Sequence, residues 1–186
     1  MRSLARLAPG DPLLVASLSD THPAVLAAAL AALRDEPRKA PRAEVLAVLA
    51  DASRGADVLL ELVAYLTVPG QDIDEDTAAT LLHFAARADL KPEARLAVLA
   101  GIPRLGVPLS PKLKREFEPL TVASDAAIRD AALVALTLLK DSRARRELVK
   151  VYDEQIKDNE GWPLAYQRRG KIFLRIHEYG DAAKDF

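Results

Sequence analysis

The stretch Asp125–Leu139 reads Asp-Ala-Ala-Ile-Arg-Asp-Ala-Ala-Leu-Val-Ala-Leu-Thr-Leu-Leu, and it predicts an amphipathic helix. Its apolar residues recur at steps of three and four, which is the period of a helix with one buried face. The residues on that face are Ile128, Ala131, Ala132, Ala135, Leu136 and Leu139. Because small and large side chains are mixed there, a second helix can lie close against it while the leucines fill the seam.

Two earlier segments repeat this pattern together with its start signal. An Asp precedes an Ala/Leu-rich run at Asp20 and Asp89, as it does at Asp125. Pro23 and Pro92 follow in the first two copies, and the first turn of a helix tolerates the missing N–H of proline. We predict that each Asp accepts a hydrogen bond from the free N–H groups at its helix start.

Composition extends this prediction to the whole chain. Half of the 186 residues are hydrophobic and only 5% are aromatic, so the core is expected to be Ala, Leu and Val. Ala and Leu favour helices. Helix starts are expected near residues 23, 41, 56, 75, 92, 111, 125, 142 and 163. A spacing of about 17 residues per helix, or about 35 per pair, is typical of an α-solenoid. We therefore predict an all-α fold, an α-solenoid of antiparallel helix pairs.

One repeat is literal, because Leu-Ala-Val-Leu-Ala occurs at residues 46–50 and again at 96–100. Together with the Asp, Pro, Ala and Leu pattern, these helices resemble HEAT repeats, including the short bacterial HEAT-like kind. The resemblance spans about residues 11–157, and residues 1–157 are taken as the HEAT-like domain. Leu26 stands where that family often has Arg, and the third copy lacks the proline.

Aromatic and small residues follow a fixed spacing at the C-terminal end. They are Tyr166, Gly170, Phe173, Tyr179, Ala182 and Phe186. This spacing resembles the start of a tetratricopeptide (TPR) repeat. Gly170 and Ala182 would let two antiparallel helices touch. Arg169 stands where that family usually has Leu, and this departure weakens the packing argument locally. Residues 158–186 are therefore expected to form a truncated TPR-like helix pair, belonging to a longer protein whose array continues. A natural short C-terminal cap is the alternative.

Basic residues mark the predicted partner site. Arg168, Lys171 and Arg175 are three and four residues apart and share one helix face. The TPR resemblance implies that this face, with Gln167, lines a concave groove for an acidic peptide or a terminal carboxylate. A solvated helix face is the alternative. A second basic group precedes it and either extends the same surface or faces water: Arg143, Arg145, Arg146 and Lys150.

Catalytic and metal-binding residues are not expected. No two of His22, His83 and His177 are three or four apart, so a zinc site has little support. The acidic run 72–76 alternates like a calcium loop, but Thr77 and His83 occupy the places of the required Gly and Glu. Acidic residues at a helix N-terminus explain that run better.

We therefore expect a non-enzymatic scaffold that binds a peptide or helix of a protein partner and uses no cofactor. The alternative is a HEAT-like DNA-binding repair enzyme of the DNA glycosylase type. Such an enzyme needs a strongly basic face, and the net charge is −1, so nucleic acid is not an expected partner. Pro9 and Gly10 interrupt the first apolar run, no run reaches the length of a membrane span, and cysteine is absent. We expect a cytoplasmic protein.

Overall fold

The computed structural model describes residues 11–34, 42–50, 56–68, 73–158 and 163–186, and every regular element among them is helical. The all-α prediction is confirmed for these residues. The chain divides into two compact units, Met1–Pro119 and Leu120–Phe186. This division does not test the predicted change from HEAT-like to TPR-like repeats at residue 157, which stays a prediction.

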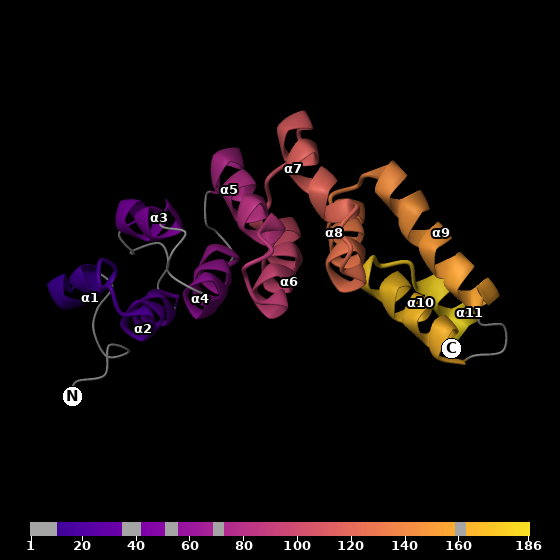
Figure 1. Cartoon of the computed structure of the whole chain (residues 1–186), viewed down its shortest axis with the longest axis horizontal. Coiled ribbons are helices and arrows are strands. Elements are labelled where there is room, and N and C mark those ends of the chain that lie inside the picture. The colour runs from indigo at the N-terminus through magenta and orange to yellow at the C-terminus, as the bar shows by residue number, and fades with distance from the viewer. Residues whose placement is uncertain (1–10, 35–41, 51–55, 69–72, 159–162) are drawn as a thin grey trace. The chain divides into compact units, whose positions relative to one another are not determined.

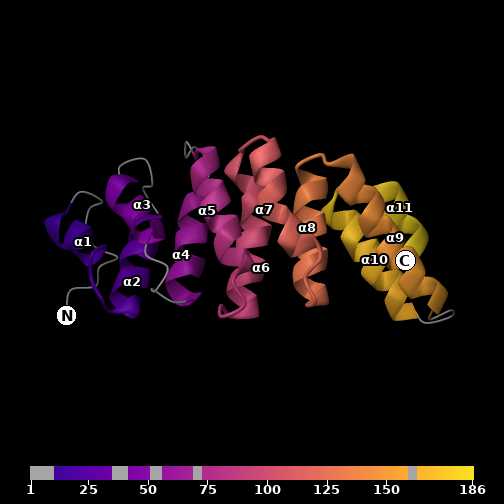
Figure 2. The ribbon, with the colours of Figure 1, turned by 45° about the horizontal axis from the view of Figure 1, so that its top comes forward.

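In chain order, the described helices of the first unit are α1 Pro12–Ser17, α2 Pro23–Leu33, α3 Arg42–Ala50, α4 Ala56–Leu66, α5 Glu75–Ala86, α6 Pro92–Gly101, the 3₁₀ turn η3 Ile102–Leu105 and α7 Pro111–Thr121, whose end passes into the second unit. The even-numbered helices α2, α4 and α6 pack on one another in turn, and α3 contacts α4 and α5 (Figure 1). Helices α5 and α6 lie side by side in both views (Figure 2).

The contact between α4 and α6 depends on a glycine. A Cβ atom added at Gly101 would lie 2.7 Å from Cγ1 of Val63 and 3.2 Å from Cγ2 of Thr67. Real Cβ atoms do not approach that closely, so the two helices meet where residue 101 has no side chain. Leucines fill the rest of this core, among them Leu30, Leu62 and Leu82, which are at most 1% exposed.

The predicted Asp cap is confirmed at Asp125. One carboxylate oxygen of Asp125 accepts hydrogen bonds from the N–H groups of Ala127 (2.9 Å) and Ile128 (3.3 Å). Ser110 likewise caps α7 by accepting from the N–H of Leu113 at 3.1 Å.

The same prediction holds only in part for the first copy and is wrong for the second. Asp20 accepts from the N–H of His22 at 2.7 Å, and His22 itself caps α2 through its ring Nδ1. Asp89 accepts from Arg87, and the capping position of α6 is Lys91, whose side chain makes no cap bond. Proline begins both helices, so the capping residue directly precedes it and the Asp lies two residues too early.

Among residues 120–158 and 163–186, the helices of the second unit pack in chain order. They are α8 Ala126–Leu138, α9 Ser142–Asp158, α10 Pro163–Arg175 and α11 Tyr179–Asp185. Helix α8 packs on α9, α9 on α10 and α10 on α11 (Figure 1). Most of the predicted α8 face is buried, but Leu133 and Val134 outside that face are buried too. Helix α8 is therefore covered on more sides than its periodicity predicts.

Helices α8 and α10 end in the same way, in left-handed residues that are not glycine. Lys140 has a φ of 66° and His177 a φ of 64°. The N–H of Lys140 bonds the carbonyl of Thr137, and the N–H of Asp141 bonds that of Leu136. The same pair of bonds follows α10, so both ends are Schellman motifs.

The predicted close contact between the last two helices is confirmed. A Cβ atom at Gly170 would lie 2.9 Å from Cε2 of Phe186 and 3.1 Å from Cβ of Asp185. Ala182 of α11 is 1% exposed. The absence of a side chain at Gly170 thus allows the close approach of the chain end to α10 that the sequence indicated.

Candidate functional site

A groove opens between α9, α10 and α11 of the second unit, with a volume of about 620 Å³. Helix α9 supplies most of its wall, α10 supplies two residues and α11 two more. The lining residues are Arg145, Arg146, Val149, Lys150, Asp153, Glu154, Lys157, Arg169, Phe173, Asp181 and Lys184. Its volume is in the range of natural ligand sites.

The two faces of α9 explain why this wall is polar. Ala144, Leu148, Tyr152 and Ile156 recur every four residues and are buried. Arg146, Lys150, Asp153 and Lys157 recur at steps of three and four on another side and line the groove. Residues at these spacings share one face of a helix, so one stripe fills the core and the other runs along the groove.

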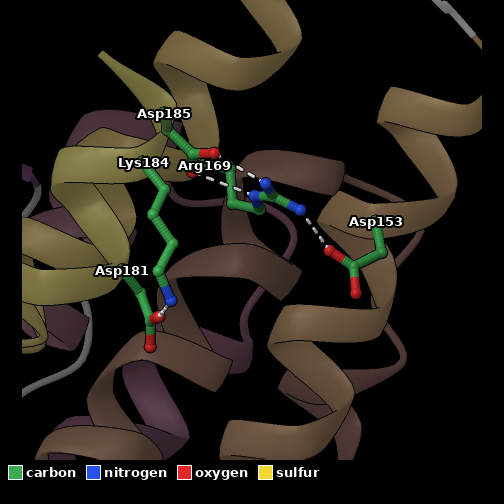
Figure 3. A network of polar contacts seen from close by, with 5 residues as sticks. All are labelled: Asp153, Arg169, Asp181, Lys184 and Asp185. Carbon is green, nitrogen blue, oxygen red and sulfur yellow. Dashed lines mark hydrogen bonds and ion pairs between the residues drawn. The ribbon is translucent and has the colours of Figure 1, made fainter.

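Arg169 links the three helices around the groove. Its Nε and Nη2 donate to the carboxylate of Asp185 on α11, at 2.9 and 2.6 Å, and its Nη1 donates to Asp153 on α9 at 2.5 Å (Figure 3). The guanidinium carbon also lies 5.8 Å from the ring centre of Tyr166 and 5.9 Å from that of Phe173. Bonding to Asp185, chiefly, raises the pKa of Arg169, so this cation is permanent.

The role of Arg169 was not predictable from the sequence. Its departure from the TPR pattern weakened the packing argument for that resemblance, and the structure shows that Arg169 ties α10 to both neighbours. The Asp185 side chain is 1% exposed, so Arg169 also compensates a buried charge. Only the fold brings Asp153 and Asp185, which are 32 positions apart, to the same guanidinium.

Further ion pairs lie along the groove, one between helices and two within a helix. They are Arg145–Glu178 between α9 and the start of α11, Lys150–Glu154 within α9, and Lys184–Asp181 within α11. The hydrogen bond from Lys184, at 2.6 Å, lowers the pKa of Asp181, so this carboxylate stays ionised at neutral pH (Figure 3). Every carboxylate that lines the groove is thus paired with a cation that also lines it.

Two cations in the groove differ from the rest. Arg146 and Lys157 are exposed and form no ion pair with any residue that the structure describes. They lie at the two ends of the groove-lining row of α9 that runs from Arg146 through Lys150 and Asp153 to Lys157. The groove therefore offers positive charge at each end and paired charges between them.

The residues predicted from the TPR resemblance lie elsewhere on α10. Gln167, Arg168, Lys171 and Arg175 are all exposed, and none of them lines the groove. Arg168 and Arg175 lie close enough to Tyr152 to act on its phenol electrostatically. Three members of the second basic group, Arg145, Arg146 and Lys150, do line the groove, whereas Arg143 does not.

Tyr152 joins α9 to α8 behind the groove. Its hydroxyl donates to Oδ2 of Asp130 at 2.9 Å. Oδ1 of Asp130 is buried and has no hydrogen-bond partner among the described residues. Burial, with the nearby negative charge, raises the pKa of Tyr152, and Arg168 and Arg175 only partly oppose that rise.

The acidic run acts at a helix start, as the sequence indicated. Asp74 caps α5 by accepting from the N–H of Thr77 at 2.8 Å. Glu75 accepts from Ser110, and Asp76 pairs with Lys112 at the start of α7. Asp72 and the single tryptophan, Trp162, lie outside the described residues.

Metal-binding and membrane features were searched in the same residues. Within the described ranges, no group of three or more His, Asp or Glu side chains is placed to hold a metal ion. No helix in those ranges has the length and apolar character that a bilayer crossing requires.

Comparisons of the chain with protein-family models, with curated proteins and with solved structures gave no match. The assignment of function therefore depends on the groove and on the helix packing.

Proposed function

We propose that this chain is a non-enzymatic interaction module that holds a peptide or helix of a protein partner. In this proposal its helix pairs stack as an α-solenoid, HEAT-like to about residue 157 and TPR-like from 158 to 186. The packing of α2 on α4 and of α4 on α6 supports such stacking within the first unit. Stacked repeats expose long surfaces whose chemistry is recognition.

The groove of the second unit carries the proposal. It combines an apolar floor, Val149 and Phe173, with a charged rim held in place by ion pairs across three helices. Rigid walls lower the entropic cost of binding, since few side chains must be ordered when the partner arrives. An apolar centre with a polar rim is also the usual anatomy of a protein interface.

Site-specific crosslinking tests this function. A photo-reactive benzoylphenylalanine replaces Val149 in the groove, and in a control chain it replaces Arg143 on the same helix outside the groove. We expect one partner segment to crosslink at residue 149 and not at 143, identified by mass spectrometry of the crosslinked peptides.

Charge reversal then separates the two candidate faces. The purified partner should bind the Arg146→Glu/Lys150→Glu/Lys157→Glu variant at least tenfold more weakly than the native chain. It should bind the Arg168→Glu/Lys171→Glu/Arg175→Glu variant nearly as well as the native chain. Loss confined to the second variant would move the site to the exposed α10 face. Salt-sensitive binding of duplex DNA by the native chain would instead favour the repair-enzyme alternative.

A further inference from the structure

We infer that the groove takes an extended, acidic segment in which two carboxylates flank an apolar residue. This inference rests on the proposed function and specifies the ligand of the same groove. It differs from the site that the TPR resemblance implies, because it uses α9, Arg169 and Phe173 in place of Gln167, Arg168, Lys171 and Arg175.

The charges that line the groove indicate whether the ligand is acidic or basic. Its lining carboxylates, Asp153, Glu154 and Asp181, all have cation partners in the groove. Arg146 and Lys157 have no ion-pair partner among the described residues. A basic segment would leave these two cations facing like charge, whereas an acidic segment would pair with both.

The spacing of those cations sets the length of the ligand. Arg146 and Lys157 are eleven positions apart, which is close to three full turns and about 16 Å along α9. An extended chain covers that distance in about five residues. The groove is open along α9, so an extended segment of that length can lie on it with one carboxylate at each cation.

The floor between the two cations explains the central apolar residue. Val149 lies one turn after Arg146 on α9, and Phe173 of α10 is 7% exposed. The rim pair Lys150–Glu154 is long, at 3.7 Å, and both side chains are well exposed. Exposed pairs of this kind are weak, so a ligand carboxylate can draw Lys150 away from Glu154.

Selection from displayed peptides tests the inference. A library of random twelve-residue peptides, each followed by a fixed neutral linker so that no terminal carboxylate is free, is selected on the immobilised full chain. We expect enrichment of peptides with Asp or Glu four to six positions apart and an apolar residue between them. The Arg146→Ala/Lys157→Ala variant should bind the enriched peptides at least tenfold more weakly than the native chain does, measured by fluorescence anisotropy.

A matched variant controls for the loss of two charges. Arg104→Ala/Arg143→Ala removes two exposed cations outside the groove and should leave the peptide affinity within twofold. Circular dichroism of both variants should match that of the native chain, and a groove variant that fails to fold is replaced by Arg146→Gln/Lys157→Gln.

Each remaining result overturns the inference in a distinguishable way. Enriched peptides of basic or neutral character that depend on Arg146 and Lys157 would refute the acidic ligand but keep the proposed function. If acidic peptides are enriched but only the Arg168→Ala/Lys171→Ala/Arg175→Ala variant loses their binding, this site is refuted. No enrichment, or enrichment unaffected by either set of variants, would refute the inference and the proposed groove together.

Discussion

Individual residues hold strain in this chain at the ends of two helices. Lys140 and His177 adopt the left-handed conformation that closes a Schellman motif, although glycine is the usual residue there. A side chain in that region costs free energy because its Cβ crowds the following carbonyl. Both motifs keep their two hydrogen bonds, so the local strain is offset by the satisfied helix ends.

Lys140→Gly should therefore stabilise the second unit by about 1 kcal/mol, since the strain at Cβ outweighs the extra freedom of glycine in the unfolded chain. Urea unfolding followed by circular dichroism measures the change in the free energy of unfolding. Lys140→Ala keeps the Cβ and serves as the control. Equal stabilisation by glycine and alanine would show that the effect does not come from the left-handed backbone.

Lys91 is a second residue whose substitution should raise stability. It occupies the capping position of α6 without a side-chain cap bond, and its positive charge faces the positive end of the helix dipole. Lys91→Asn should stabilise the first unit by about 1 kcal/mol, because the amide oxygen can accept from the free N–H groups. Lys91→Gln removes only the charge. If glutamine stabilises as much as asparagine, the capping argument is wrong.

The sequence predicted caps well only where no proline intervened. Asp125 directly precedes its helix and caps it, whereas Asp20 and Asp89 precede helices that begin with Pro23 and Pro92. A proline fixes the first helical position. The residue before it is thereby placed at the cap, whatever its type, and this explains why His22 and Lys91 replaced the predicted residues.

At the scale of helices, sequence periodicity predicted the elements but not the contacts between them. The helix start expected near residue 163 is the start of α10, and α11 follows it as the second of two helices. The arrangement of Arg169, Asp153 and Asp185 was not predictable, because the sequence does not show which charged residue on another helix will be the partner of a given side chain. The groove between α9, α10 and α11 was missed for the same reason.

Arg169→Leu, which restores the usual residue of the resembling family, should destabilise the second unit by about 2 kcal/mol. The buried Asp185 would lose its bidentate partner, and an uncompensated buried charge is costly. Thermal unfolding followed by circular dichroism measures this loss.

The double variant Arg169→Leu/Asp185→Leu tests the reason given. Since it leaves no charge unpaired in the core, it should recover at least half of the stability lost by Arg169→Leu. A double variant less stable than the single one would show that leucine at position 169 does not fit, and that the ion pair is not the cause.

At the scale of the whole molecule, the chain consists of two compact units, Met1–Pro119 and Leu120–Phe186. Repeat periodicity did not reveal this division, because the spacing of helix starts is similar on both sides of residue 119. Compact units with their own cores are expected to open separately. The fully buried Leu82 and Ile128 belong to the first and second core respectively.

Leu82→Ala should accelerate amide hydrogen exchange in α5 and α6 while leaving α8 to α11 unchanged. Removing a buried leucine side chain costs about 2–5 kcal/mol, and that cost should fall on its own unit. Hydrogen exchange measured by mass spectrometry reports each helix separately. Ile128→Ala is the reciprocal variant. Faster exchange throughout the chain in either variant would show that the two units unfold as one.

The burial of Tyr152 beside Asp130 makes the molecule sensitive to alkali. Because burial raises the pKa of this phenol above that of a free tyrosine, the folded chain keeps the proton that the unfolded chain releases above about pH 10. The stabilisation is complete below that pH and declines as the pH rises further. Ultraviolet titration at 295 nm should therefore show a late ionisation step for Tyr152, and Tyr152→Phe should remove that step. The second unit thus carries an optical indicator of its own unfolding, which needs no added dye.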